Sequence, residues 1–283
     1  MKHLATLFLL LASFLVPLSA AAKSPNIILV MTDDQGYADI SFNTHHPAEV
    51  ATPHMDSLAK EGVFFTNAYT SGHVCSPTRA GLMLGRYQQR VGVYTAGDGG
   101  RGFDPKLPIF PAFLPKEYTS TAIGKWHLGE DPALQGFDVS IAGNQRGATR
   151  RHLAPWNLPR LPEQADGTPL ADALTDHAIK FIEDNAAGPF LLMLSHYAVH
   201  TPVQAPPSEI AIWAKKLPDE PKKRHRYAAL VDSVDRSVGR VRKALEENGC
   251  ADRTLLIFTS DNGPVDRTRG YRARWVKGDT AIY

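Results

Sequence analysis

Short runs of apolar residues recur along the chain and predict strands that are buried on both faces. The predicted strands cover residues 26–32 (NIILVMT), 63–69 (VFFTNAY), 117–123, 189–197 (PFLLMLSHY) and 253–260 (RTLLIFTS). Continuous apolar runs, in contrast to alternating ones, are typical of strands in a parallel sheet that is covered by helices.

Between these runs, apolar residues recur at steps of three and four, which predicts helices over residues 51–62, 77–86, 170–187 and 224–248. The longest of these helices has an apolar face formed by Tyr227, Leu230, Val234, Val238, Val241 and Leu245. Residues 143–169 have no periodicity, so we expect a long surface loop there. Strands that alternate with helices predict an α/β fold, with a mostly parallel (mixed) central sheet sandwiched between helices.

The first 22 residues have the pattern of a secretory signal peptide. Lys2 precedes an apolar run from Leu4 to Val16, and small residues from Ser19 to Ala22 follow it. A short membrane anchor is the alternative, but the run is short for a helix that spans a bilayer. We therefore expect export to the periplasm or the medium, without stable membrane insertion. Residues 23–283 then form the mature chain.

Charges nearly balance, with 31 Lys and Arg residues against 29 Asp and Glu residues, and no long run has one sign. This excludes the basic surface that is typical of nucleic-acid-binding proteins. The chain has two cysteines, Cys75 and Cys250. So few cysteines indicate that core burial stabilises the fold, although a Cys75–Cys250 disulfide is an alternative that the sequence leaves open.

Oxygen-bearing side chains follow two of the predicted strands at their carboxyl ends. Asp33 and Asp34 come directly after residues 26–32, and Asp261 and Asn262 come directly after residues 253–260. In parallel sheets these ends meet at one edge, where ligands bind. Each pair alone is typical of a turn, but together the carboxylates would repel each other without a cation. The sequence therefore predicts a hard divalent metal ion, calcium before magnesium.

Cys75 stands at the head of the helix that contains Pro77, with Arg79 one turn further along. Exposed N–H groups and the helix dipole at this position favour a thiolate or an anionic substrate. Arg79 lies on the same face and can reach back towards residue 75. The alternative is a buried structural cysteine beside a solvated arginine.

Further basic or protonatable side chains follow two more predicted strands. In the segment GKWHLGE, Lys125 and His127 alternate on one side of an extended chain, so both can point at one centre. His200 precedes Thr201-Pro202 in a predicted loop, whereas His196 still belongs to a strand and is expected in the core. Together these groups describe a pocket for a tetrahedral oxyanion and its leaving group.

At this point the motifs resemble a known family. The segment CSPTR at residues 75–79, followed by AGLMLGRY, resembles the C-x-P-x-R signature of the type I sulfatases, and GKWHLG resembles their second signature. The strand ending in Asp33-Asp34, the segment TPHMDSLAKEGVFFTNAY, His200-Thr201-Pro202 and TSDNG follow in the expected order. The resemblance spans nearly all of the mature chain and implies an alkaline-phosphatase-like fold.

The resemblance also implies cofactors. In this family the signature cysteine is oxidised to Cα-formylglycine by a formylglycine-generating enzyme during export. Residue 75 would then be the nucleophile, as the hydrated aldehyde. Calcium would be held by Asp33, Asp34, residue 75, Asp261 and Asn262.

The roles of the remaining residues also follow from the family. Arg79 would fix the hydrate and offset charge near the metal. Lys125 and His200 would bind the sulfate oxygens and help to protonate the leaving alcohol. His127 would contact the second hydroxyl of the hydrate and act as the base of the last step, in which the aldehyde reforms and sulfate leaves.

The chain departs from the family pattern at three places. Thr78 stands where serine is commoner in the signature. The family has a further sulfate-binding lysine after Asp-Asn-Gly, for which Lys277 is the candidate, although its spacing matches poorly. The chain ends at KGDTAIY, before the family's smaller C-terminal subdomain, so we expect residues 23–283 to be a catalytic domain truncated at its C-terminus.

Two other functions remain as alternatives. Phosphonate or phosphate ester hydrolases of the same superfamily also use formylglycine, and a non-catalytic calcium- or glycan-binding relic would keep the fold without turnover. For a sulfatase, the expected substrate is an aryl sulfate or a sulfated carbohydrate. Four arginines of the predicted loop would then contact a sulfated glycan or form a solvated basic surface: Arg146, Arg150, Arg151 and Arg160.

Overall fold

The computed structural model of this chain describes residues 24–43 and 50–264. The predicted signal peptide and Lys277 lie outside these described residues. Within them, no helix combines the length and the apolar character that crossing a membrane requires.

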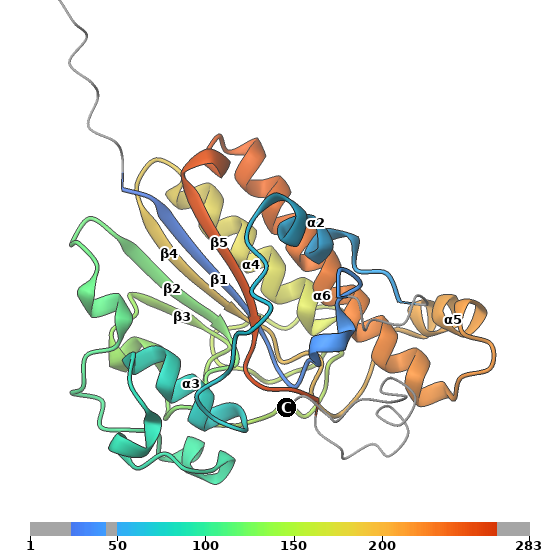
Figure 1. The fold of residues 1–283 in the computed structure, drawn as a ribbon, viewed down its shortest axis with the longest axis horizontal. Helices are drawn as coiled ribbons and strands as arrows, with labels where there is room; N and C mark the ends of the chain where they lie inside the picture. Colours follow the sequence, from blue (N-terminus) through green and yellow to red (C-terminus); the bar gives the residue numbers. More distant parts are fainter. Residues whose placement is uncertain (1–23, 44–49, 265–283) are drawn as a thin grey trace, which may run out of the picture.

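Five parallel strands form the central sheet, in the order β3-β2-β4-β1-β5 (Figure 1). Their bounds are β1 Asn26–Thr32, β2 Thr119–Gly124, β3 Val139–Ile141, β4 Phe190–Ser195 and β5 Thr254–Ser260. The shared direction brings the carboxyl ends of all five strands to one edge, as predicted. The site described below lies at that edge.

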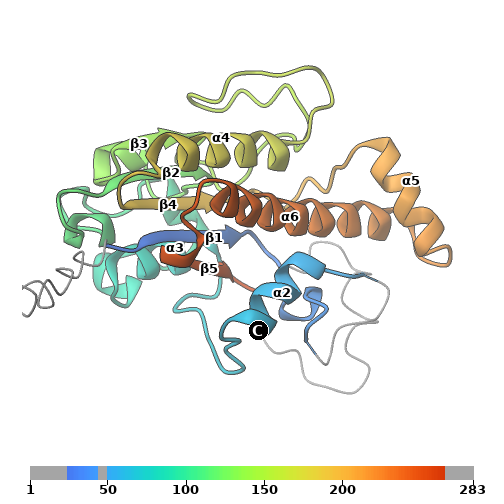
Figure 2. The same cartoon turned by 90° about the horizontal axis from the view of Figure 1, so that it is seen from above.

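Helices cover both faces of this sheet (Figure 2). Their bounds are α2 Pro53–Glu61, α3 Cys75–Leu84, α4 Leu170–Asn185, α5 Pro207–Lys216 and α6 Lys222–Glu247. Short 3-10 helices span Tyr37–Asp39, Gln88–Val91, Ala96–Gly100, Phe110–Phe113, Pro132–Gln135 and Ala251–Arg253. The predicted α/β sandwich is therefore confirmed.

The two core layers are separated by the alternation of side chains along each strand. In β1, Ile28 and Val30 pack in the layer that contains α4 and α6, whereas Leu29 and Met31 pack in the layer that contains α3. The strand β4 is buried along its whole length for the same reason. The six residues predicted for the apolar face of α6 are all buried.

The predicted strand over residues 63–69 is wrong. This segment pairs with no strand among the described residues, and Val63, Phe65 and Tyr69 are between 71% and 77% exposed. Phe64 alone packs, against the rings of Tyr37 and Phe42 at centroid distances of 6.0 and 5.2 Å. Without a neighbouring strand, its backbone groups have no ladder to join, and the apolar pattern cannot form a strand by itself.

Three other elements refine the prediction. The short strand β3 and the helix α5 were not predicted. Residues 143–169 contain no helix and no strand, as expected, but they do not lie only on the surface, because Trp156, Leu158 and Leu161 are buried in the core layer of α4 and α6.

Candidate active site

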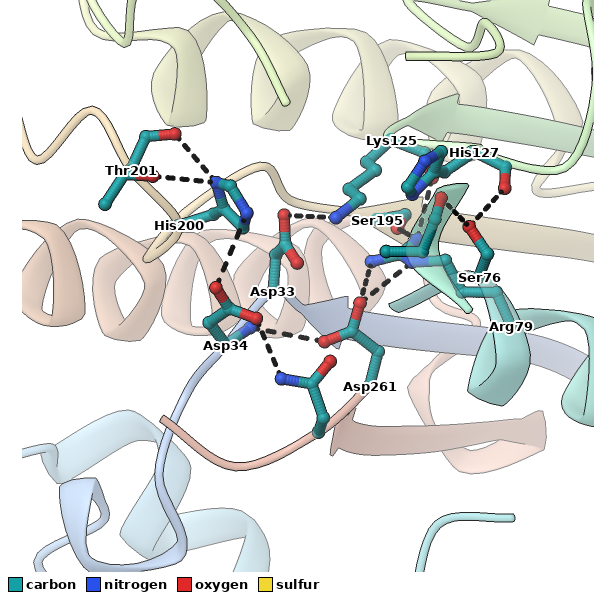
Figure 3. Close-up of polar contacts among 12 residues, drawn as sticks. Asp33, Asp34, Ser76, Arg79, Lys125, His127, Ser195, His200, Thr201 and Asp261 are labelled. Carbon is teal, nitrogen blue, oxygen red and sulfur yellow. Dashed lines mark hydrogen bonds and ion pairs between the residues drawn. The ribbon is translucent and has the colours of Figure 1, made fainter. Parts of the chain in front are cut away.

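The two pairs of oxygen-bearing side chains that follow β1 and β5 lie close together at the sheet edge (Figure 3). The strands are in register up to Thr32 and Ser260, so the next residues of both meet. The N–H of Asp34 donates to Oδ1 of Asp261 at 3.2 Å, and Nδ2 of Asn262 donates to Oδ1 of Asp34 at 2.8 Å. The structure thus brings together all four predicted oxygen ligands.

Lys125 reaches this cluster from the end of β2. Its N–H donates to the carbonyl of Ser195 at 2.7 Å, which continues the pairing of β2 with β4 by one residue. Its Nζ lies 2.6 Å from Oδ2 of Asp33, and neither side chain is exposed. The ammonium group therefore lies inside the carboxylate cluster.

Arg79 holds α3 against the same cluster. Its Nε and Nη2 lie 2.9 and 2.8 Å from Oδ2 of Asp261. Its Nη1 donates to the carbonyl of Lys125 at 2.9 Å and to Oγ of Ser195 at 2.7 Å. Burial opposes the charge of the guanidinium, but the carboxylates of Asp261 and Asp33 outweigh it, so that the pKa of Arg79 lies above its ordinary value. The alternative of a solvated arginine is wrong.

Cys75 is the first residue of α3 and is 7% exposed. Both cysteines are free, so the disulfide to Cys250 is absent. Burial raises the pKa of the Cys75 thiol, with Lys125 opposing this effect and Asp33 and Asp261 adding to it. The thiol is therefore neutral near pH 7, and the structure does not favour the thiolate that the helix N-terminus suggested.

His127 lies in a narrow space between two glycines. A Cβ on Gly99 would lie 2.2 Å from Cδ2 of the ring, and a Cβ on Gly147 would lie 2.3 Å from Cε1. The backbone of His127 has φ of 62°, so the segment is not extended at this point, contrary to the prediction. It is held by its N–H, which donates to the carbonyl of Asn144 at 2.9 Å, and by its carbonyl, which accepts from Ser76 Oγ at 3.1 Å.

The ring of His127 is neutral. Burial, together with the charges of Lys125 and Arg79, lowers its pKa to about 3. Its Nδ1 is buried without a hydrogen-bond partner in the described part of the chain. The unpaired nitrogen is free to bind a ligand, whereas the two cations oppose protonation of the ring.

His200 lies at the outer side of the site. Its Nδ1 is 2.7 Å from the carbonyl of Thr201 and its Nε2 is 3.5 Å from Oδ2 of Asp34. Because a carbonyl oxygen can only accept, Nδ1 carries the hydrogen and Nε2 faces the site. Burial lowers the pKa of His200, as does Lys125. His196, by contrast, is buried in the core next to Ser237, as predicted.

The donor set at this edge fits a hard cation. Ligand atoms of Asp33, Asp34 and His200 lie within 4.8 Å of one another. Oδ1 of Asp33 and Oδ1 of Asn262 are buried and have no hydrogen-bond partner among residues 24–43 and 50–264. Burying two oxygens without a partner costs free energy, and a bound cation would offset this cost by coordinating both.

The charges of the cluster lead to the same conclusion. Asp33, Asp34 and Asp261 outnumber the cations Arg79 and Lys125 by one. Burial raises the pKa of Asp33 well above its ordinary value, although Lys125 opposes this. For Asp261 burial acts in the same direction, but Arg79 and Lys125 outweigh it and the pKa is lowered. A divalent cation beside Asp33 would stabilise its charged form.

Four residues of the site were not predicted from the sequence. Ser195 accepts from Arg79, Ser76 donates to the His127 carbonyl, and Gly99 and Gly147 flank the His127 ring. Ser76 lies inside the CSPTR motif, which was the available signal, but nothing in the sequence near the other three marked them. At Thr78, Oγ1 donates to the carbonyl of Gly72 at 2.9 Å, a bond that serine would make equally well.

The sequence of this chain matches a family model and several known proteins. A family model described as Sulfatase matches residues 25–281. The N-acetylgalactosamine-6-sulfatase of Mus musculus is 30% identical over 91% of this chain and 54% of its own length. The uncharacterized sulfatase YdeN of Escherichia coli (strain K12) is 29% identical over 90% of this chain and 56% of its own length.

A solved structure shows a similar backbone. Ps i-CgsB, crystallised in complex with k-i-k-neocarrahexaose, has a TM-score of 0.73 and 32% sequence identity, covering 86% of this chain and 59% of that chain. The chain thus spans little more than half the length of each of these proteins.

Proposed function

This chain belongs to the sulfatase family, and from that membership we propose that the protein hydrolyses sulfate monoesters at residue 75. One observation carries the proposal. The side chains of Asp33, Asp261, Arg79 and Lys125 converge from four separate segments, buried, and all four act on the electrostatics of Cys75. Such a cluster of buried, fixed charges is what stabilisation of a reacting oxyanion requires.

We propose that Asp33, Asp34, Asp261 and Asn262 hold a calcium ion together with residue 75. The two unpaired oxygens, Oδ1 of Asp33 and Oδ1 of Asn262, support this assignment. Bound calcium would polarise a sulfate oxygen and favour ionisation of the nucleophile.

Formylglycine at residue 75 completes the proposal, and the Sγ of Cys75 stands in for the hydroxyl oxygens of its hydrate. A hydrated aldehyde supplies a nucleophile and a second hydroxyl whose ionisation expels the product. The neutral thiol supports the need for such a conversion, because a buried thiol is a weak nucleophile.

The remaining residues orient the ester and move protons. Lys125 Nζ binds a sulfate oxygen and offsets its charge. His200 presents Nε2 to the ester, since Nδ1 is engaged by Thr201. In its protonated form, which neighbouring Asp34 favours, it carries a hydrogen on Nε2 and helps to protonate the leaving alcohol. His127, whose ring is neutral, takes the proton of the second hydroxyl, and bound sulfate would offset the charges of Lys125 and Arg79 that lower the pKa of this ring. Arg79 holds residue 75 and Asp261 at fixed positions.

A sulfated carbohydrate is the proposed natural substrate, and export with maturation by a formylglycine-generating enzyme is the proposed route. A relative at 30% identity is named N-acetylgalactosamine-6-sulfatase, and a neighbour at 32% identity was crystallised with k-i-k-neocarrahexaose. The signal-peptide pattern supports export. Aryl sulfates would then serve as convenient assay substrates.

The first test is a mass spectrum of the peptide that contains Cys75, from protein exported by a host that makes formylglycine. An aldehyde in place of the thiol is the expected result. An unmodified thiol in protein that still hydrolyses sulfate esters would contradict the formylglycine mechanism, and an unmodified thiol without hydrolysis would favour the relic.

The second test separates the roles by substitution. We expect Cys75→Ala to abolish hydrolysis with little change in folding, and Cys75→Ser to trap a sulfated enzyme. Asp33→Ala and Asp261→Ala should lose bound calcium and activity together, whereas Asp166→Asn, an exposed carboxylate, should lose neither. Calcium content measured by plasma mass spectrometry decides this, and retention of calcium in both alanine variants would refute the ligand assignment.

Parallel assays on sulfate and phosphate esters distinguish the related hydrolases. We expect kcat/KM for the sulfate monoester to exceed that for the phosphate mono- and diester. The reverse order would assign the protein to the phosphonate or phosphate ester hydrolases.

A further inference from the structure

A cavity of about 770 Å³ lies between α5, the start of α6 and the loop that contains residues 151–167. In Figure 2, α5 and the N-terminal end of α6 extend beyond the edge at which the strands end. Its volume is within the range of about 300–1,000 Å³ that is usual for small-molecule sites. Nothing in the proposed catalytic mechanism uses it.

Positive charge lines this cavity without any negative charge. Arg151, Lys222 and Arg226 contribute to its wall, and none of the lining residues is acidic. In the described part of the chain, none of these three side chains forms an ion pair or donates a hydrogen bond. Cations that lack protein partners at a concave surface attract anionic ligands, and the fork of a guanidinium matches two oxygens of a tetrahedral oxyanion.

The rest of the wall suits a sugar ring. Leu153, Ala154, Ala205 and Ile210 supply apolar surface. Gln204 also lines the cavity, and its Oε1 accepts from the N–H of His152 at 3.1 Å. This bond fixes the amide so that its Nε2 is left as a donor, with no partner among the described residues. Apolar contacts and a few fixed donors are the usual means of orienting a ligand.

A short segment of chain links the cavity to the catalytic centre. His200 and Gln204 are four residues apart, which limits the distance between their Cα atoms to about 14 Å. Buried His152 connects the two positions, since its Nε2 lies 3.0 Å from the carbonyl of His200 while its N–H binds Gln204. A ligand with its ester at His200 could therefore extend along residues 200–204 into the cavity.

We propose that this cavity binds a second sulfate group, carried by a neighbouring sugar of the same substrate. The proposal rests on the proposed function and specifies its substrate class: an oligosaccharide with sulfate on more than one residue. Arg226 and Arg151 bind the second sulfate, Lys222 adds to the positive field, and the apolar wall packs against the sugar ring.

The test compares two substrates in the full-length protein. Wild type, Arg151→Gln, Arg226→Gln and Arg150→Gln are assayed with para-nitrophenyl sulfate and with a carrageenan hexasaccharide that carries several sulfates. Arg150 is the matched control, because it is an exposed arginine of the same loop that does not line the cavity. Thermal unfolding of each variant confirms that it is folded.

We expect Arg151→Gln and Arg226→Gln each to lower kcat/KM for the hexasaccharide about tenfold and to leave the rate on para-nitrophenyl sulfate unchanged, with Arg150→Gln neutral on both. Equal losses on the two substrates, or the same loss in Arg150→Gln, would overturn the proposal in favour of a general charge effect. Hydrolysis of both substrates without any loss in the variants would overturn it and leave the proposed function intact. Failure of the wild type to hydrolyse either substrate would instead refute the proposed function, and this inference with it.

Discussion

The site has an inner and an outer half that are held in different ways. In the inner half, Arg79, Lys125, Asp33 and Asp261 are almost completely buried and joined by contacts of 2.6 to 2.9 Å. The outer half consists of Asp34, His200 and Asn262. There, Asp34 and His200 keep 12% and 16% of their side chains exposed and lie 3.5 Å apart.

This difference in burial indicates that the inner half contributes to the stability of the fold, whereas the outer half contributes to ligand binding. A buried ion pair repays its desolvation only while both partners are present, so that removing one leaves an uncompensated charge in the core. Groups of the outer half can still be solvated when a partner is removed. We therefore expect substitutions in the inner half to lower both stability and activity, and those in the outer half to lower activity alone.

The largest loss of stability is expected from Arg79→Met, which keeps most of the length of the side chain but removes its charge. The substitution leaves Asp261 buried without its ion-pair partner, and we expect it to lower the free energy of unfolding by about 3–5 kcal/mol. Urea unfolding measures this, with Arg86→Met as the control because Arg86 is exposed just after α3. Unfolding energies equal to those of the control would show that the inner half does not hold the fold.

A smaller effect is expected from His196, which is buried beside the inner half but belongs to the core. Burial lowers its pKa to about 4, and neighbouring His152 adds to the shift. The unfolded chain, with an ordinary histidine pKa of about 6.5, therefore binds more protons between these values, so stability falls as the pH drops from about 6.5 to 4. The expected loss from His196 is about 2–3 kcal/mol at pH 4.5.

The measurement is the difference between the unfolding free energies at pH 7 and pH 4.5. Wild type should lose more stability than His196→Gln over this interval, and His177→Gln, on α4, should behave as wild type. If His196→Gln and wild type lost the same amount, His196 would not be the neutral core group that the structure shows.

The next prediction concerns the ring of His127, which Gly99 and Gly147 confine and which forms no side-chain hydrogen bond within the described residues. We expect Gly99→Ala to lower kcat/KM about 100-fold, since the new Cβ would meet both the ring and Oγ of Ser76 at 2.2 Å. The matched control is Gly100→Ala, where an added Cβ meets nothing within 4 Å. Equal activity of the two variants would remove His127 from the proposed mechanism.

The smallest change in stability is expected in the outer half, from His200→Asn. We expect the free energy of unfolding to change by no more than about 0.5 kcal/mol, as for surface positions, and kcat/KM to fall about tenfold. A loss of stability similar to that of Arg79→Met would contradict the division into two halves.

Most elements of the fold were predictable because their signals are local. The apolar runs of β1, β2, β4 and β5 and the spacing in α4 and α6 each lie within one segment. Residues 63–69 have a similar apolar content, yet they form no strand, because a strand also needs a partner for its backbone. The sequence does not indicate which partner is present.

The N-terminal end of α2 also depends on a partner that the local sequence does not indicate. The carboxylate that accepts from the N–H groups of His54 and Met55 is Asp235, 180 residues or more away on α6. Gly239 permits this close approach, since a Cβ there would lie 2.6 Å from His54. Only the packed helices reveal why α6 needs a glycine at that position.

The sequence by itself determined the order of β1, β2, α4, β4, α6 and β5, the resemblance to the family, and the residue types at the strand ends. Tertiary structure decided the partners, because Arg79 meets Asp261 across 182 positions and Lys125 meets Asp33 across 92. It also decided which oxygens stay unpaired, which glycines confine His127, and where the cavity of Arg151 and Arg226 lies. Periodicity is a property of neighbours along the chain, whereas ion pairing and desolvation depend on every group within a few ångströms, whatever its place in the sequence.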